Sequence, residues 1–370
     1  METGVLHKPM KQRDYLFDNY KTLLILLVVM GHFIEPCADN TEFLHTIKWL
    51  IVSFHMPAFI FISGYFSKRE LPLTVIIRKL AVPYVAYEVI YYLFYTFITH
   101  KKTGLYLLYP KFSLWYLLAL FIWRAATPYV KKIPHYMLLA VAFGLLIGCS
   151  DMSDNFLSLP RILYFYPFFL AGMNFNRDVI TKLRCNSMRV LATCTITAFA
   201  AFFTLSPVCH TLSPKIFYGR YNYGFLGQNM LAGILTRCIC YAIGFIMTFA
   251  VMVLVSEKKT CYSYIGTRTM AIYLFHGLTY SYLKDCTSLL QNVDTAAETA
   301  LLLTFCIILT AVFSAPVLTT FTNQIADLHL PKLPKARRQA GHILLNIRTA
   351  LLAWRFDYLS FRILMYGGRV

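Results

Sequence analysis

The sequence predicts an all-α integral membrane protein, polytopic, with about ten transmembrane helices and both termini in the cytoplasm. Of its 370 residues, 58% are hydrophobic and only 14% are charged. Apolar stretches long enough to cross about 30 Å of hydrocarbon recur along the whole chain. These stretches are continuously apolar rather than alternating, which favours helices over a β-barrel, because a spanning segment has to satisfy its own backbone groups.

Ten segments carry the apolar pattern of a span. We expect them at about residues 18–34, 43–66, 75–98, 113–130, 134–149, 160–175, 188–205, 232–255, 264–281 and 298–320. The fifth, sixth and ninth are short, so the number of spans carries an error of about one. We divide the chain into a membrane domain, 1–325, and a basic tail, 326–370. The tail is expected to form an amphipathic helix at the cytoplasmic interface, and a loosely ordered tail is the alternative.

The distribution of positive charge sets the expected orientation. With the N-terminus inside, the inside segments hold 24 Lys and Arg residues and the outside loops hold six. Cytoplasmic loops are enriched in Lys and Arg, so this bias predicts that both termini are inside and that the number of spans is even. The six outside cations are Lys101, Lys102, Lys111, Lys215, Arg220 and Lys284.

Composition also excludes several classes of protein. The net charge of +18 is explained by the cytoplasmic loops, and no soluble stretch is present that would carry a nucleic-acid module. The ten cysteines show no metal-ligand spacing, so we expect no metal. Phosphate-binding loops, nucleophile elbows and dinucleotide fingerprints are absent from the sequence, and we expect no bound cofactor.

The first predicted span is the most informative segment. Lys21 and His32 are eleven residues apart, which on a helix gives about 16 Å of rise on faces only about 20° apart. A neutral imidazole can accept a hydroxyl proton near pH 7, so His32 is a candidate general base. A structural histidine bonded to a neighbouring helix is an equal alternative. Glu35, one turn further, either orients that ring or contacts a bound ligand, with solvation in the loop as an equal alternative.

Other ionisable residues lie inside predicted spans, where they usually face a cavity or a partner. His55 precedes the helix-kinking Pro57, and we expect it to orient or bind a ligand rather than only to pack. Arg161 either belongs to a site or snorkels towards water. His276 either belongs to a site or only packs against its neighbours. Lys48 lies near a span end, where we expect its amine to snorkel towards water.

The predicted second inside loop is basic. It contains Arg69, Arg78 and Lys79. The positive-inside rule alone explains these residues. The alternative is that they hold a phosphorylated donor, because guanidinium groups bind phosphate in a bidentate manner.

Several motifs together resemble a known family. One motif is a Lys or Arg followed by ten residues and then a His, and Lys21 and His32 match it. Phe54-His55-Met56-Pro57 and Phe61-Ile62-Ser63-Gly64-Tyr65 follow in the second span, and Leu114-Trp115-Tyr116-Leu117, Pro167-Phe168-Phe169-Leu170-Ala171-Gly172 and Tyr273-Leu274-Phe275-His276 come later. Over residues 14 to about 320 the chain resembles the membrane acyltransferase-3 family of polysaccharide O-acetyltransferases, in its fucose 4-O-acetylase-like branch.

The resemblance implies a membrane-bound O-acetyltransferase. Such an enzyme would move acetyl from acetyl-CoA to a hydroxyl of a cell-envelope or exported carbohydrate, in a plasma membrane such as a bacterial inner membrane. With the patterns above, it implies catalytic roles for His32, Lys21 and Glu35, donor binding by Arg69, Arg78 and Lys79, and substrate binding or orientation by His55, Trp115, Arg161 and His276. His32 would act as base or carry the acyl group itself.

Two other functions remain open at this stage. A transporter or flippase for a sugar or lipid-linked sugar would use the same polar residues without chemistry. A structural or assembly partner in the membrane would need none of them. Consumption of acetyl-CoA distinguishes the enzyme from both. The sequence makes no prediction of oligomeric state.

Overall fold

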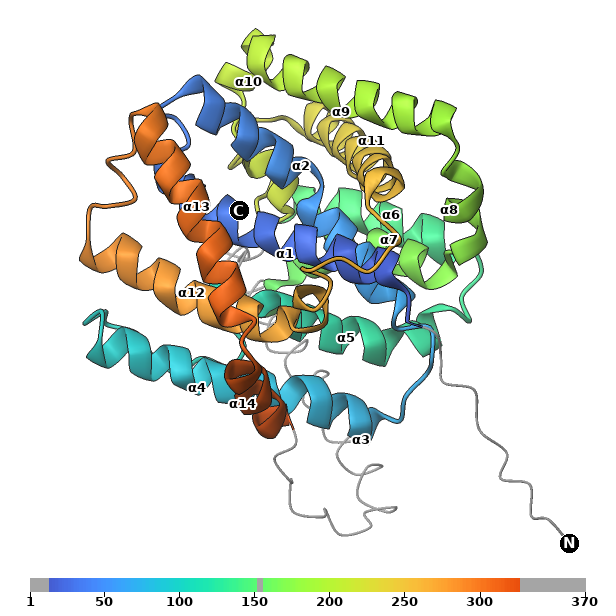
Figure 1. The fold of residues 1–370 in the computed structure, drawn as a ribbon. Coiled ribbons are helices and arrows are strands. Elements are labelled where there is room, and N and C mark those ends of the chain that lie inside the picture. The colour runs from blue at the N-terminus through green and yellow to red at the C-terminus, as the bar shows by residue number, and fades with distance from the viewer. Residues whose placement is uncertain (1–12, 152–155, 327–370) are drawn as a thin grey trace, which may run out of the picture. The chain divides into compact units, whose positions relative to one another are not determined.

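The computed structural model describes residues 13–151 and 156–326, and every regular element within these ranges is a helix or a helical turn (Figure 1). The predicted tail lies outside the described residues, apart from its first residue. The longer helices are α1 (Tyr15–Ile34), α2 (Glu42–Tyr65), α4 (Val82–Phe97), α5 (Trp115–Val130), α6 (Tyr136–Leu146), α7 (Leu159–Asn174), α9 (Asn186–Leu205), α11 (Met230–Leu254), α12 (Thr269–Cys286) and α13 (Ala296–Phe313). The shorter ones are α3 (Leu73–Ile76), α8 (Arg177–Leu183), α10 (Pro207–Thr211) and α14 (Pro316–Ala326).

The all-helical membrane fold predicted from composition is confirmed. Six helices in the described part of the chain are long and apolar enough to cross a membrane: the segment that includes α1, the one that includes α7, and α2, α9, α11 and α13. A total of ten spans and the cytoplasmic placement of the termini stay predictions. Each predicted span overlaps one of the longer helices, most of them within a few residues at either end.

Two boundaries differ from the expected ones for local reasons. The last predicted span, 298–320, is divided, because α13 ends at Phe313 and α14 begins at Pro316. Proline has no amide hydrogen to donate and disfavours a helical conformation of the residue before it, which favours a break at this position. The ninth span begins later than expected, at Thr269, after a separate 3-10 turn at Ile265–Thr267.

Burial separates the central helices from the peripheral ones. In α2, 67% of the apolar window is buried, against 11% in α9. Exposed aliphatic side chains such as Val190 and Leu191 of α9 cover its outer surface. A helix that is apolar around its whole circumference suits a lipid environment, so we interpret α9 as facing lipid and α2 as the centre of the helix packing.

Two glycines allow α2 and α7 to pack backbone to backbone. A Cβ atom added to Gly64 would lie 2.0 Å from the carbonyl oxygen of Phe169, and one added to Gly172 would lie 1.8 Å from that of Phe61. Small residues at such crossings let membrane helices approach closely. This contact fixes α7, and therefore Arg161 in its first turn, against α2.

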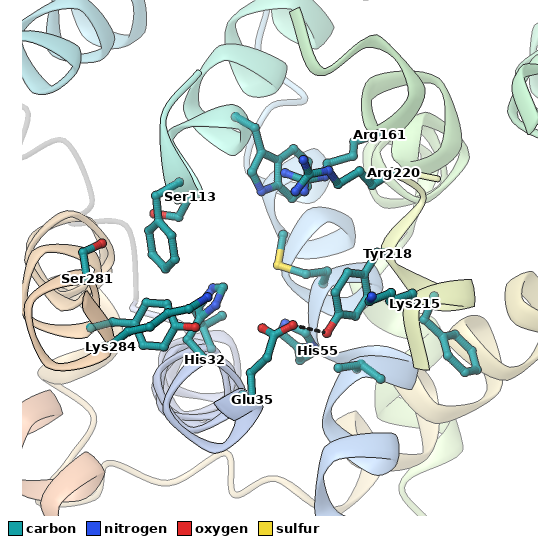
Figure 2. A pocket seen from close by; sticks show the side chains of 18 of the residues that line it. His32, Glu35, His55, Ser113, Arg161, Lys215, Tyr218, Arg220, Ser281 and Lys284 are labelled. Carbon is teal, nitrogen blue, oxygen red and sulfur yellow. Dashed lines mark hydrogen bonds between the residues drawn. The ribbon is translucent and has the colours of Figure 1, made fainter. Parts of the chain in front are cut away.

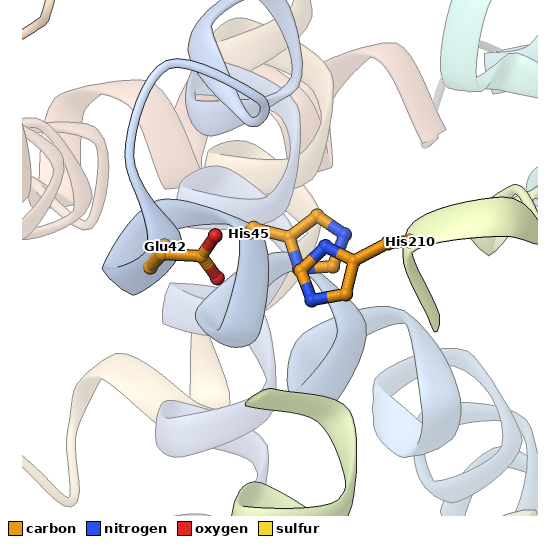
Figure 3. Close-up of side chains that lie close together, drawn as sticks. All are labelled: Glu42, His45 and His210. Atoms are coloured by element: carbon orange, nitrogen blue, oxygen red, sulfur yellow. The ribbon is translucent and has the colours of Figure 1, made fainter. Parts of the chain in front are cut away.

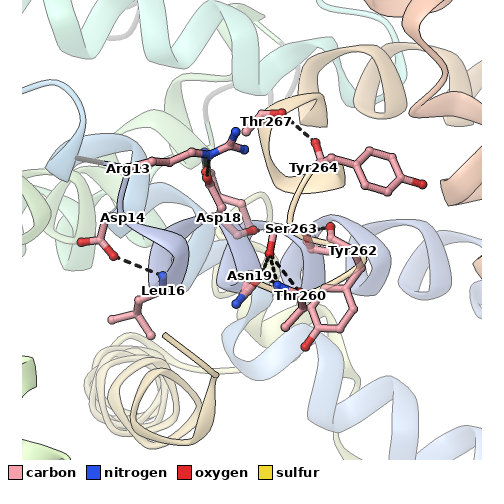
Figure 4. Close-up of polar contacts among 12 residues, drawn as sticks. Arg13, Asp14, Leu16, Asp18, Asn19, Thr260, Tyr262, Ser263, Tyr264 and Thr267 are labelled. Carbon is pink, nitrogen blue, oxygen red and sulfur yellow. Dashed lines mark hydrogen bonds and ion pairs between the residues drawn. The ribbon is translucent and has the colours of Figure 1, made fainter. Parts of the chain in front are cut away.

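The start of α1 is anchored by one asparagine. The Asn19 amide nitrogen donates to the carbonyls of Ser256 (2.8 Å) and Lys258 (2.9 Å), and its oxygen accepts from the hydroxyls of Thr260 (3.0 Å) and Ser263 (2.6 Å). Figure 4 shows this cluster between α1 and the segment that connects α11 to α12. The first turns of α1 are therefore bonded to a segment that lies more than 200 residues later in the chain.

Replacing Gly64 by alanine tests the α2–α7 contact. We expect Gly64→Ala to lower the stability of the purified protein by about 1–3 kcal/mol, because a methyl group has no room against a backbone carbonyl. Gly224→Ala is the matched control, since a Cβ there meets only the Asn222 side chain, at 3.9 Å. Thermal unfolding in detergent measures both, and equal melting temperatures for the two variants would contradict this packing.

Replacing Asn19 by leucine tests the anchor of α1. Asn19→Leu removes the acceptor of the Thr260 and Ser263 hydroxyls and the donor to the Ser256 and Lys258 carbonyls, and we expect it to cost about 2–4 kcal/mol. The control is Asn186→Leu at the exposed start of α9, where we expect little change. Chemical unfolding followed by tryptophan fluorescence provides the readout. An Asn19→Leu protein as stable as the control would show that the cluster does not hold the helix.

Candidate functional site

A cavity of about 470 Å³ lies where α1, α2, α7 and α12 meet the start of α5 and the segment after α10 (Figure 2). Five of the residues predicted from the sequence line it: His32, Glu35, His55, Trp115 and Arg161. They come from four different helices and the turn that follows α1, so the fold brings together residues that are up to 129 positions apart.

His32 lies in the last turn of α1 and faces this cavity. Its ring centroid is 4.8 Å from that of Phe112 and 5.7 Å from that of Tyr280, so aromatic rings support it on two sides. Among the side chains drawn in Figure 2, none is hydrogen-bonded to the His32 ring. The ring also lines the cavity, so we interpret its nitrogens as open to a ligand there.

A second histidine lies behind His32. The His276 ring centroid is 5.4 Å from that of His32, but His276 is fully buried and is not part of the cavity lining. Its Nδ1 is paired with the Ile272 carbonyl at 3.0 Å, which makes Nδ1 the protonated nitrogen. Its Nε2 has no hydrogen-bond partner among the described residues. This placement suits a residue that positions His32 rather than one that touches a ligand.

His55 lies in the cavity wall contributed by α2. Its Nδ1 is 2.6 Å from the Ile51 carbonyl, one turn earlier in the helix. Donation from Nδ1 leaves Nε2 as the hydrogen-bond acceptor of the neutral ring. His55 thus has a fixed tautomer and a ring that can accept a proton or a hydrogen bond.

Lys48 does not snorkel, so the expectation for this residue is wrong. It is 4% exposed, and its amine donates to the Gly31 carbonyl at 3.0 Å and lies 3.4 Å from the Glu35 carboxylate. Glu35 also accepts a hydrogen bond from the Tyr218 hydroxyl at 3.1 Å. The amine points inward because the short turn after α1 supplies a carboxylate partner. The acidic residue in this short turn is the feature of the sequence that could have predicted the Lys48–Glu35 pair.

Arg161 lies over an aromatic face. Its guanidinium carbon is 4.9 Å from the centre of the Trp115 ring, within the range of a cation–π interaction. Trp115 in turn stacks on Phe165 at 5.7 Å, and all three residues line the cavity. The wall at this side therefore combines a positive charge with flat apolar surface.

The other predicted site residues lie elsewhere. Lys21 is 3.1 Å from the Asp18 carboxylate and 5.0 Å from the Phe66 ring, in the polar cluster at the start of α1. Arg78 and Lys79 are exposed in a π-helical turn, Ile77–Ala81, between α3 and α4. Arg69 lines a separate pocket of about 10 Å³. In the described ranges none of these four borders the large cavity, and their roles stay predictions.

A cluster that the sequence did not suggest lies at the start of α2. Possible ligand atoms of Glu42, His45 and His210 lie within 4.8 Å of one another, and the two imidazoles stack at 5.0 Å (Figure 3). However, the Trp49 indole donates to His45 Nε2 at 3.1 Å. A neutral imidazole has one lone pair to offer, and here the indole uses it. We interpret the cluster as a stack that joins α10 to α2.

The Lys48–Glu35 pair predicts a non-additive effect on stability. Lys48→Met leaves the Glu35 carboxylate and the Gly31 carbonyl without their donor, and we expect a loss of about 1–3 kcal/mol. In the double variant with Glu35→Gln we expect part of this loss to be recovered, with a coupling of about 0.5–2 kcal/mol. Denaturant unfolding of the four proteins measures the cycle. Strictly additive changes would show that the two groups do not interact.

Comparison with known proteins gives one match. A family model described as an acyltransferase domain matches residues 14–320, which include every residue of the cavity lining. Searches among curated proteins and among solved structures gave no match. The match covers most of the chain and agrees with the motifs of the first two helices, so the family predicted from the sequence is confirmed. This chain is a member of the acyltransferase-3 family of multi-pass membrane proteins.

Proposed function

We propose that this membrane acyltransferase is an O-acetyltransferase that moves acetyl from acetyl-CoA to a hydroxyl group of a carbohydrate. The observation that carries the proposal is the His32 ring at the wall of a cavity of about 470 Å³. A cavity of this volume is of the size that accepts a small ligand. Its wall includes the rings of Trp115, Tyr221 and Tyr280, whose flat faces suit the apolar face of a sugar.

In the proposed reaction His32 is the general base. One ring nitrogen takes the proton of the acceptor hydroxyl while the oxygen attacks the thioester carbonyl. The tetrahedral intermediate then expels the thiolate of CoA, which receives the same proton from the imidazolium. An ester and a free thiol result, and His32 returns to its neutral form. His276, behind the ring, positions it for this exchange.

An acetyl group carried on His32 is the second route. The imidazole would attack the thioester directly, and the acceptor hydroxyl would displace it in a second step. Both routes place the same ring at the acetyl carbonyl. The two differ in kinetics, because a covalent intermediate releases CoA before the acceptor binds.

The donor phosphates are proposed to bind at the basic loop, which comprises Arg69, Arg78 and Lys79. Arg69 borders its small pocket together with Arg124, Lys131 and Glu70, so three cations and one carboxylate line it. Guanidinium groups are suited to phosphate in charge and in shape. The loop and its pocket are separate from the large cavity, so the thioester arm must pass between them.

Tyr116 is the proposed point of passage for the thioester arm. Its hydroxyl is 2.5 Å from that of Ser63, one turn before Ser67 of the small pocket. Its ring contacts Tyr273 at 5.6 Å, and Tyr273 contacts His276 at 6.0 Å. These contacts support a path from the pocket to the histidines past the two rings, which a rotation of Tyr116 would open.

Loss of the base is expected to abolish transfer. His32→Ala should lower kcat by about 10²–10⁴-fold, the range for removal of a positioned general base. The assay measures CoA release and acetylated oligosaccharide with the purified protein. His100→Asn, at an exposed histidine, is the control and should retain activity. A folded His32→Ala protein that transfers acetyl at the wild-type rate would overturn the proposal.

A further inference from the structure

We propose, on the basis of the proposed function, that the carbohydrate acceptor carries an anionic group. A carboxylate, phosphate or sulfate on the acceptor would bind at a cationic rim of the cavity. The rim consists of Arg161, Lys215, Arg220 and Lys284, which all line the cavity. Figure 2 shows all four around the space that His32 faces.

The charges around the cavity are unequal. Among the described lining residues, six are cations and two are carboxylates. Each carboxylate has a lysine of its own: Glu35 lies 3.4 Å from Lys48, and Asp285 lies 2.6 Å from Lys101. These two pairs neutralise themselves, so that neither carboxylate is the ion-pair partner of Lys215 or Lys284. Like charges at the mouth of a low-dielectric cavity concentrate a positive potential there.

The excess of positive charge at the rim is unusual for the side of the membrane on which the rim is predicted to lie. In the predicted orientation the outside loops contain only six Lys and Arg residues. Four of them, Lys101, Lys215, Arg220 and Lys284, line this single cavity. The bias that enriches cations on the cytoplasmic side does not account for a concentration on the other side. Attraction of an anionic ligand does account for it.

Aromatic rings hold the charged groups of the rim in place. Lys215 and Arg220 lie over the same ring, that of Tyr221, at 5.7 and 5.4 Å, and Lys284 lies 5.5 Å from the Tyr280 ring. A ring face positions a cation without cancelling its charge. The rim therefore presents ordered positive groups beside flat surfaces, an arrangement that suits an acidic sugar.

Two sources can supply an anion to this cavity: an acidic group of the acceptor and the phosphates of CoA. The basic loop, on the predicted cytoplasmic side, already accounts for the phosphates. The rim lies at the end of α1 that is opposite to the basic loop in the predicted topology. We therefore assign the rim to the acceptor.

The test uses the full-length protein in nanodiscs and two matched oligosaccharides. One contains a uronic acid, and the other is its carboxyl-reduced, neutral counterpart with the same linkages. Equilibrium binding and acetyl transfer are measured for both, at low salt and at about 0.3 M salt, where charge interactions are screened. The variants are Lys215→Met with Lys284→Met, and, as control, Lys102→Met at an exposed lysine outside the cavity lining.

We expect the acidic oligosaccharide to bind at least about fivefold more tightly than the neutral one. This difference in affinity should disappear at high salt and in the double variant, and it should persist in the control variant. Equal binding of the two sugars would overturn the inference, and transfer to both would leave the proposed function standing. Binding of the acidic sugar without transfer would support the inference and contradict the proposed function. A double variant that loses affinity for CoA instead would assign the rim to the donor.

Discussion

His32 faces the cavity because α1 is held at both of its ends. Asn19 anchors the first turns to the segment after α11 with four hydrogen bonds, and Lys48 bonds to the carbonyl of Gly31, directly before His32. A general base acts only when its nitrogen lies within hydrogen-bonding reach of the proton that it removes. In the proposed mechanism a small displacement of α1 would slow the transfer, and the hydrogen bonds at its two ends oppose such a displacement.

The bilayer explains why ionisable side chains gather at one place in this fold. A charged or strongly polar group that faces lipid is expensive, so such groups in membrane helices turn towards one another or towards a cavity. His32, His55 and Arg161 do so from three helices, and Lys48 does so in company with Glu35. In the proposed mechanism, the rings of Tyr116 and Tyr273, whose centroids are 5.6 Å apart, separate the basic loop from the cationic rim. Two anionic molecules would then approach one histidine from opposite sides.

Much of this arrangement could be predicted from the sequence. The apolar runs predicted the positions of the helices. The free-energy cost of placing polar groups in a membrane indicated which residues of these helices line a cavity. The pairing of Lys48 with Glu35 was missed because a lysine near a span end normally reaches water. The hydrogen bonds of Asn19 join residues more than 200 positions apart, and no local pattern encodes such contacts. The stack of His45 on His210 depends in the same way on how α10 returns to α2.

An experimental structure with a non-transferable acetyl-CoA analogue and an acceptor oligosaccharide tests the central claim most directly. The account predicts that the acetyl carbonyl and one acceptor hydroxyl lie beside the His32 ring, with a ring nitrogen about 3 Å from the hydroxyl oxygen. Tyr116 should then have moved aside. The account would be contradicted if both ligands were bound and the reacting atoms met at a site that His32 does not touch.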